Sequence, residues 1–236
     1  MAIAEQAAVK AQTKTTPKKR QRVFWHVDDR PVPYDRALGF MDAKVNMIRE
    51  KGEDDYIWLL EHPPVYTAGT SAEAKDMLNP RFPVYTAGRG GQYTYHGPGQ
   101  RVAYVMLDLQ RRNPGAGPDL KVYIHKLEEW VIRALAHFDV KGERREGRVG
   151  IWVDMQPYGR PKGTEAKIAA IGVRVRKWVA FHGVAINVSP DLSHYSGIVP
   201  CGIAQHGVTS LADLGIKASM AEMDKALKAS WEEVFD

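Results

Sequence analysis

Two residues in this chain have types and a spacing suited to nucleophilic chemistry, and Cys201 is the first of them. It is the only cysteine among 236 residues, and it stands between Pro200 and Gly202, a pair that favours a turn. A thiol with a pKa of about 8.5 is only a few per cent thiolate at neutral pH. A nearby cation and the N–H groups of a turn would raise that fraction. Cys201 is therefore either a nucleophile or, as is commoner for a lone cysteine, a small buried apolar residue.

Lys167 is the candidate for that cation. It begins the run Lys-Ile-Ala-Ala-Ile-Gly-Val-Arg at 167–174, a strand of small apolar residues in which a solvated lysine would be unusual. A lysine withdrawn from water can exchange a proton with a thiol. A lysine at a strand end can equally extend its ammonium group into water along an apolar stem. The spacing alone leaves both interpretations open.

A glycine-rich segment at 89–100, Arg-Gly-Gly-Gln-Tyr-Thr-Tyr-His-Gly-Pro-Gly-Gln, is the third feature. Its glycines allow the backbone to approach a ligand closely. The segment is not a dinucleotide fingerprint, and the chain has no G-x-x-x-x-G-K-[ST] phosphate loop. His96 and His182 each precede a glycine, so we expect both at tight turns, as ligand contacts or as satisfied turn residues. No His/Asp/Glu group has a metal-ligand spacing, and we expect neither metal nor cofactor.

Composition restricts the class of protein. The chain is 44% hydrophobic and 26% charged, as soluble domains are, and no apolar run approaches the ~18 residues of a membrane span. One cysteine suits a reducing compartment and excludes an intramolecular disulfide. The net charge of +5 belongs to residues 1–22, because residues 23–236 carry 27 basic and 27 acidic groups. We expect a disordered basic tail at 1–22, and a body at 23–236 that binds neither nucleic acid nor membrane.

Hydrophobic periodicity predicts interleaved strands and helices, often without a helix between consecutive strands. We therefore expect an α+β fold, a single domain with a mixed or antiparallel sheet flanked by helices. The pentapeptide Val-Tyr-Thr-Ala-Gly occurs at 65–69 and 84–88 and suggests two similar strand-to-turn units. The predicted strands are 23–27, 56–60, 102–109, 149–153, 168–175 and 178–188, and the predicted helices are 33–52, 119–138 and 219–235.

Five details of this prediction are specific enough to be tested. Asp119 should cap its helix, and Ser219 with Glu222 should form a capping box. Val122 should belong to the apolar face of the helix that Asp119 begins. Residues 141–148 should form a charged loop, and Thr209 or Ser210 should cap a short helix.

The four motifs taken together are recognisable. R-G-G-x-x-T-x-H-G-P-G-Q at 89–100, K-I-A-A-I-G-V-R at 167–174, H-G-x-A-x-N-V at 182–188 and P-C-G at 200–202 stand in this order. They closely resemble the octanoyltransferases of lipoate biosynthesis, the lipoyl(octanoyl) transferase or lipoate-protein ligase B family, over residues 23 to about 235. The resemblance implies the fold shared by biotinyl and lipoyl protein transferases. Gly88, where an acidic residue is often found, and a long loop at 155–164 depart from the pattern.

The resemblance also implies roles for individual residues. Cys201 matches the acyl-thioester nucleophile, and Lys167 matches its activating partner. The substrate-binding segments match Arg89, Gly90, Gly91, Gln92, Tyr93, Thr94, Tyr95 and His96, together with Ala170, Ile171, Gly172, Gly183, Val184 and Ala185.

The implied activity moves an octanoyl group from octanoyl-acyl carrier protein to a lysine of lipoyl domains. These acceptors are the E2 subunits of 2-oxoacid dehydrogenases and the glycine cleavage H protein. The bacterial cytoplasm is the expected compartment, ahead of the mitochondrial matrix. The alternatives are an ATP-dependent lipoate or biotin ligase on the same fold and a non-catalytic module that binds carrier or lipoyl domains. A nucleic-acid binder rests on the tail alone.

Overall fold

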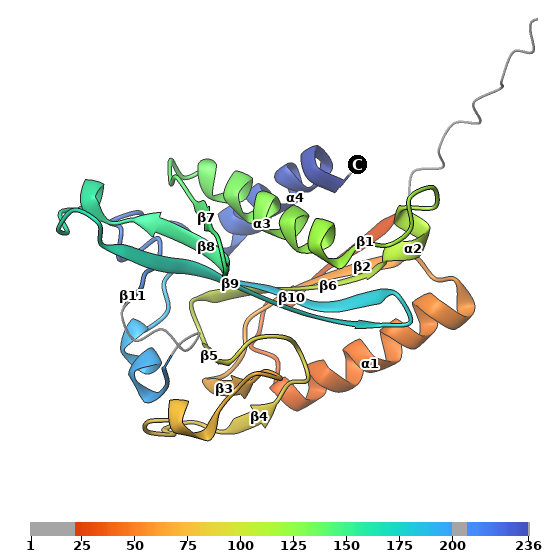
Figure 1. Cartoon of the computed structure of the whole chain (residues 1–236), viewed down its shortest axis with the longest axis horizontal. Coiled ribbons are helices and arrows are strands. Elements are labelled where there is room, and N and C mark those ends of the chain that lie inside the picture. Colours follow the sequence, from red (N-terminus) through yellow and green to blue (C-terminus); the bar gives the residue numbers. More distant parts are fainter. Residues whose placement is uncertain (1–21, 200–206, 236) are drawn as a thin grey trace, which may run out of the picture.

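A mixed β-sheet forms the frame of the molecule. The computed structural model describes residues 22–199 and 207–235. Within them the main sheet has the strand order β1-β2-β6-β10-β9-β8-β7, and β11 pairs with β9 (Figure 1). Its strands are β1 Val23–Val27, β2 Asp55–Leu60, β6 Gln100–Asp108, β7 Glu143–Arg145, β8 Arg148–Asp154, β9 Glu165–Arg176, β10 Val179–Asn187 and β11 Gly207–Val208. The pairs β1–β2 and β11–β9 are parallel and the others antiparallel.

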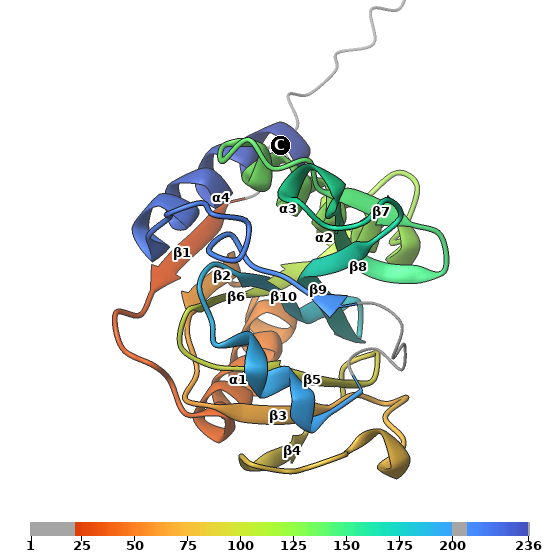
Figure 2. The ribbon, with the colours of Figure 1, turned by 90° about the vertical axis from the view of Figure 1, so that its left-hand side faces the viewer.

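Helices cover both faces of this sheet. On one face lie α3 (Leu120–Ala136) and α4 (Met220–Phe235), packed on each other and on the sheet. On the other face α1 (Tyr34–Lys51) covers one half, and a small sheet of β4 (Val84–Thr86), β3 (Val65–Ala68) and β5 (Tyr93–His96) lies beside the other half (Figure 2). Short elements are α2 Leu109–Arg112, η1 Ala74–Asp76, η2 Gln156–Tyr158 and η3 Leu192–Gly197.

The apolar periodicity of the chain explains this layering. Alternate residues of β8 and β9 point to the α3–α4 face, where Ile151, Val153 and Ile168 join the main core. A second core lies between α1 and the opposite sheet face. Trp152 and Lys167 are adjacent to these core residues in sequence, so they point to that opposite face. The prediction of an α+β fold with a mixed sheet and flanking helices is confirmed.

The predicted helix caps are present. The Asp119 carboxylate accepts hydrogen bonds from the amides of Lys121 and Val122. Ser219 and Glu222 form the reciprocal capping box at the start of α4. Gly52 ends α1 in the left-handed conformation that glycine adopts without cost.

Three predictions of local structure were wrong. Residues 141–148 contain the strand β7, which pairs with β8 through the backbone, and Arg145 of β7 forms an ion pair with Glu165 of β9. The strand was missed because its charged residues show no apolar alternation. The predicted short helix after Thr209 or Ser210 is absent from residues 210–219, and the Ser210 hydroxyl instead accepts from the amide of Asp213 in a turn. Val122 is 51% exposed, because it lies on the outer side of α3, whereas Tyr123 in the same turn is buried in the core.

The repeated pentapeptide forms a pair of strands. Its two copies supply β3 and β4, which pair in parallel, with Tyr66 opposite Val84 and Thr67 opposite Tyr85. Both copies are thus strand-forming units of the small sheet, as predicted.

The basic tail at 1–21 lies outside the described residues, so the prediction of disorder there stays untested. Among residues 22–199 and 207–235, no helix is both long and apolar enough to cross a membrane.

Candidate active site

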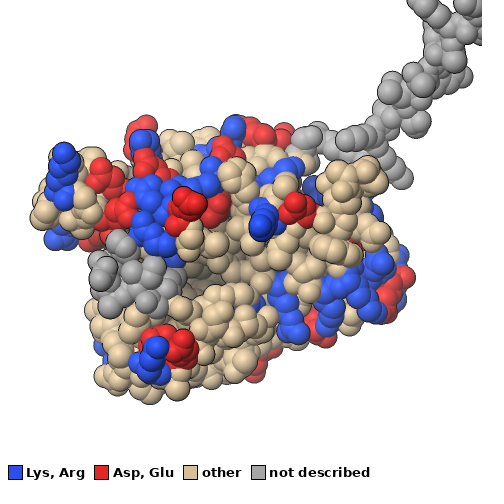
Figure 3. Space-filling view, viewed as in Figure 1, with Lys and Arg blue, Asp and Glu red and all other residues tan. Residues whose placement is uncertain are grey.

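A cavity of about 300 Å³ lies between β9–β10 of the main sheet and the glycine-rich segment that leads into β5. This volume is at the lower end of the range of about 300–1,000 Å³ for small-molecule sites. On the face shown in Figure 3, a hollow lies directly below a cluster of charged side chains, and the visible surface beneath it is largely uncharged. The cavity is lined by Tyr34, Ser71, Arg89, Gly91, Gln92, Tyr93, Thr94, His96, Val102, Tyr104, Gly147, Arg148, Val149, Lys167, Ala170, Ile171, Gly172, His182, Gly183, Val184 and Ala185.

Lys167 lines this cavity and is only 7% exposed. Its Nζ donates to the carbonyl oxygen of Val149 at 3.1 Å and lies 4.7 Å from the centre of the Trp152 ring. An aromatic face stabilises the charged form that an amine has once it accepts a proton. The interpretation of a solvated strand-end lysine is therefore wrong, because the side chain of Lys167 is buried in the cavity wall and does not extend into water.

Because Gly172 of β9 has no side chain, the glycine-rich segment can lie directly against this strand. A Cβ on Gly172 would lie 2.8 Å from Cδ of Arg89 and 3.1 Å from the carbonyl oxygen of Gly90. The amide of Gly90 donates to the carbonyl oxygen of Val173 at 3.0 Å. The backbone of β9 at Gly172 therefore lies directly against the Arg89 side chain and the Gly90 backbone.

Arg89 holds the segment in shape. Its guanidinium donates to the carbonyl oxygens of Gly90, Gln92 and Thr67 at 2.9–3.1 Å and to the Thr67 hydroxyl at 2.7 Å. The planar guanidinium with its fixed donors suits several acceptors at once. Arg89 thus organises the cavity wall from within.

Replacing Arg89 by lysine is expected to loosen this wall, because an ammonium group cannot reach the same acceptors together. We expect faster proteolytic cleavage within residues 89–97 and a fall of about tenfold or more in kcat/KM, mainly through KM. Arg160→Lys, at an exposed position in the connection between β8 and β9, is the matched control and should change neither. Unchanged proteolysis of Arg89→Lys would contradict the structural role of its guanidinium.

Three buried histidines and Tyr104 form a polar floor: His96, His182 and Tyr104 line the cavity, and His62 lies behind them, against Tyr104 and His96. His62 Nδ1 lies 2.6 Å from the carbonyl oxygen of Val32, so Nδ1 carries the proton and Nε2 accepts from the Tyr104 hydroxyl at 2.7 Å. Burial lowers the pKa of His62 to about 4 and that of His182 to about 3. Burial also holds the pKa of His96 well below its usual value, and it raises the pKa of Tyr104. All four groups are therefore uncharged at neutral pH.

The structure gathers most of the candidate residues at one cavity. Lys167 and all the candidates of 170–172 and 183–185 line it, as do those of 89–96 except Gly90 and Tyr95. Gly90 lies behind the wall, and Tyr95 is buried in the aromatic cluster with Tyr66 and Tyr195. Cys201 lies outside the described residues.

The expectation of a tight turn was wrong for His182, which is inside β10 and paired with β9. His96 ends β5 directly before the tight turn in which the amide of Gln100 donates to the carbonyl oxygen of Gly97. His182 has a φ of 63° and is followed by Gly183 at 158°, which marks a local distortion of the strand and not its end. A glycine after a histidine here allows close packing of strands, since a Cβ on Gly183 would meet the carbonyl oxygen of Ala103 at 2.2 Å.

Sequence reasoning did not find Tyr34, His62 and Tyr104. Tyr34 belongs to α1, His62 to the loop after β2, and Tyr104 to β6, so only the fold brings them together. His62 precedes Pro63 and Pro64, a pair that ends a strand, and this position by itself indicates no role at a cavity. Tyr104 is one of several apolar-looking residues in a buried strand.

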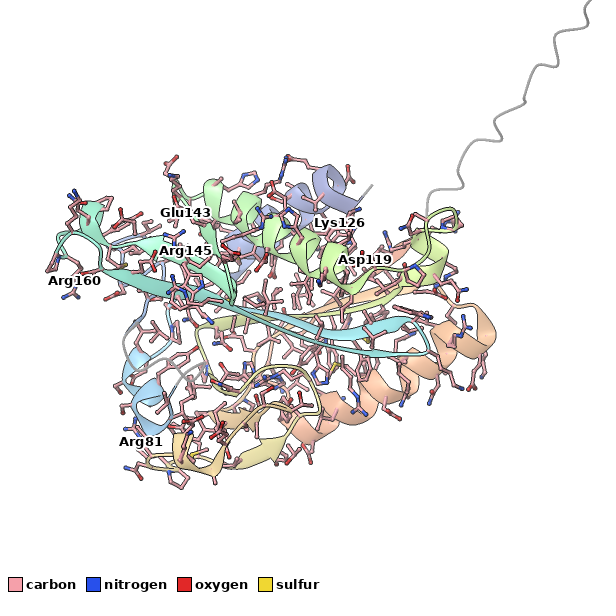
Figure 4. All side chains as sticks on the ribbon, in the orientation of Figure 1. Arg81, Asp119, Lys126, Glu143, Arg145 and Arg160 are labelled. Carbon is pink, nitrogen blue, oxygen red and sulfur yellow. The ribbon has the colours of Figure 1, made fainter. Side chains whose placement is uncertain are left out.

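The long connection between β8 and β9 lies away from the cavity. Arg160, in this connection, marks the far end of the hairpin in Figure 4. None of the residues that line the cavity belongs to 155–164. Within the described ranges 22–199 and 207–235 no group of three or more His, Cys, Asp or Glu residues could hold a metal ion.

The architecture is that of lipoate-attaching enzymes. A bipartite lipoate protein ligase from Thermoplasma acidophilum has a TM-score of 0.65 and 16% identity, over 89% of this chain and 82% of that chain. A lipoate-protein ligase A solved with bound ATP has a TM-score of 0.64 and 15% identity, over 89% and 84%. At these identities the likeness shows the fold alone.

Sequence comparison is more specific. The chain belongs to the family described as the lipoyl protein ligase A/B catalytic domain, which matches residues 33–232. An octanoyltransferase of Rhodospirillum rubrum is 62% identical over 212 residues, 89% of this chain and 94% of the relative. One of Paramagnetospirillum magneticum is 61% identical over 214 residues, 90% and 97%. The resemblance inferred from the four motifs is confirmed, and the protein is an acyltransferase.

Proposed function

We propose that the protein transfers an octanoyl group from octanoyl-acyl carrier protein to a lysine of lipoyl domains through a thioester on Cys201. The observation that carries the proposal is the buried amine of Lys167 in the wall of a largely apolar cavity. A further observation supports it. Gly207 and Val208, the first described residues after the segment that holds Cys201, pair with Ala166 and Lys167.

In the first step Lys167 takes the proton of Cys201, and the thiolate attacks the carbonyl carbon of the octanoyl thioester. The carbon–sulfur bond to the carrier breaks, and the carrier thiolate leaves with a proton from Lys167. In the second step the amine of the acceptor lysine attacks the Cys201 thioester. An amide forms, the amine gives up a proton to the same base, and Cys201 is restored as a thiol. Conversion of a thioester to an amide is downhill, so the reaction needs no ATP.

The cavity residues have separate parts in this proposal. The strips Ala170–Gly172 and Gly183–Ala185, with the glycine-rich segment at 89–96, hold the acyl chain against bare backbone. The neutral floor of His62, Tyr104 and His96 carries no charge that would oppose an apolar chain. Residues 23–236 form the catalytic domain, with 1–22 as an appended tail. E2 subunits and the glycine cleavage H protein are the proposed acceptors, and the bacterial cytoplasm is the proposed compartment.

The test is the intact mass of the protein after incubation with octanoyl-acyl carrier protein in the absence of ATP. We expect one octanoyl adduct that disappears when a lipoyl domain is added and that never forms in Cys201→Ser. Deleting residues 1–22 should leave the adduct unchanged.

Other outcomes identify the alternatives. Product formed only with ATP and free octanoic or lipoic acid, and retained by Cys201→Ser, would make the protein an adenylate-forming ligase. Binding of carrier or lipoyl domain with neither adduct nor product would make it a binding module. Either result would overturn the thioester mechanism.

A further inference from the structure

One peptide group in β8 touches a charged side chain on each face of the sheet. The carbonyl oxygen of Val149 accepts from Nζ of Lys167 at 3.1 Å, on the cavity side. The N–H of Gly150, which belongs to the same peptide group, donates to Oε1 of Glu128 at 3.3 Å. The C=O and N–H of a planar trans peptide point in opposite directions. Glu128 and Lys167 are therefore joined through a single rigid group.

A local irregularity in the β8–β9 ladder turns this peptide out of the regular pattern. Ile151 pairs with Ala169 and Trp152 with Lys167, so one step along β8 corresponds to two along β9. Gly150 next to this shift has a φ of 121°, and a Cβ there would lie 2.8 Å from the carbonyl oxygen of Ala169 and 3.3 Å from Cε of Lys167. Such irregularities often aim side chains at active sites.

Glu128 reaches the peptide from helix α3. It is 8% exposed on the face opposite the cavity, with Oε2 3.3 Å from Nε of Arg144. The next carboxylate, Glu129, is directed instead to Arg133 and to the other end of the Arg144 guanidinium. Figure 4 shows α3, between Asp119 and the labelled Glu143 and Arg145 of β7, lying over the sheet. Burying a carboxylate is costly unless its oxygens have partners, and one partner of Glu128 is this backbone amide.

We propose that Glu128 is a positioning residue for acyl transfer, acting on Lys167 through the Val149–Gly150 peptide. The carboxylate fixes the direction of this peptide, and by accepting from its N–H it strengthens the carbonyl as an acceptor for Nζ. Lys167 is thereby held at one place in the cavity wall, from the far side of the sheet. This inference rests on the proposed role of Lys167 in activating Cys201.

The test is the single-turnover rate of octanoyl-enzyme formation in three variants. Glu128→Asp keeps the charge beside Arg144 but is too short to reach the Gly150 amide, and we expect the rate to fall about 10- to 100-fold. Glu128→Gln keeps the reach and one acceptor oxygen, and should lose about threefold or less. Glu129→Ala disturbs the same arginine without touching the peptide, and should be as fast as the unchanged protein. The donor concentration that gives half of the maximal single-turnover rate should be the same in all three variants.

The order of these rates decides the matter. The positioning role would be overturned if Glu128→Asp reacted as fast as Glu128→Gln. It would also be overturned if both variants lost the same fraction of the rate and both had a lowered melting temperature, since a general loss of stability would then explain the result. The double variant Glu128→Asp with Lys167→Ala should be no slower than Lys167→Ala alone, and additive losses would also contradict it. If Lys167→Ala itself acylates at the normal rate, the proposed function fails at Lys167, a result distinct from these.

Discussion

Replacing Lys167 by alanine is expected to slow formation of the octanoyl-enzyme by about 10²- to 10⁴-fold, the usual contribution of a positioned general base. The amine is the proposed acceptor for the thiol proton of Cys201, and without it the small thiolate fraction at neutral pH limits the attack. The measurement is the rate of the octanoyl adduct in a rapid-quench experiment, followed by intact mass. Lys162→Ala, at an exposed position in the β8–β9 connection, should react at the normal rate.

A second substitution separates the amine from the packing of its stem. Lys167→Met keeps an unbranched apolar stem over Trp152 but has no group that can donate to the Val149 carbonyl or take a proton. We expect the same loss of rate as in Lys167→Ala with a melting temperature closer to that of the unchanged protein. A Lys167→Met variant that acylates at the normal rate would refute the role of the amine. Rescue of the rate at high pH in both variants would agree with it, because the thiol then ionises unaided.

The strands and helices with strong periodicity could be predicted from sequence. Val23–Val27, the helix that ends at Gly52 and the long β9–β10 pair each carry apolar spacing with a clear stop signal. The edge strand β7 could not be predicted. Its residues Glu143–Arg145 are all charged. They are held by backbone pairing with β8 and by ion pairs with Glu165 of β9 and with Glu128 and Glu129 of α3, which no local pattern reveals. Tertiary pairing overrides local propensity at such an edge.

The candidate site divides in the same way. Lys167 and the glycine strips stand out because charge and missing side chains are unusual within apolar strands. Tyr34, His62 and Tyr104 do not stand out, since they come from three separate elements and each looks ordinary in its own segment. Glu128 is hidden most fully, because a glutamate in an amphipathic helix is expected to face water. Its carboxylate accepts a hydrogen bond from the amide of Gly150, next to the register shift between β8 and β9, and the sequence does not reveal this shift.

Lowering the pH from 7 to 5 is expected to destabilise the protein through the histidines of the cavity floor. Burial lowers the pKa of His62 to about 4 and of His182 to about 3, and holds that of His96 well below normal. In the unfolded chain each titrates near 6.5. Below pH 6.5 the unfolded state therefore binds more protons than the folded state, and stability falls as the pH falls. The contribution is complete above pH 6.5 and is lost progressively down to the folded values near 4 and 3.

The size of this effect follows from the same linkage. At pH 5 the unfolded form of each histidine gains about 2 kcal/mol relative to pH 7, so His62 and His182 alone remove about 4 kcal/mol. Urea unfolding at the two pH values measures the loss directly.

Variants assign the loss to individual rings. His62→Gln should be less stable at pH 7, because the Val32 carbonyl and the Tyr104 hydroxyl lose their ring partner. Its further loss between pH 7 and 5 should nevertheless be smaller than that of the unchanged protein by about 2 kcal/mol. His125→Gln, at an exposed position on α3, should leave the pH dependence as it was. An unchanged pH dependence in His62→Gln would mean that the His62 ring takes up its proton in the folded state as readily as in water. The cavity floor would then carry charge in mild acid, and its suitability for an apolar acyl chain would be restricted to neutral and basic pH.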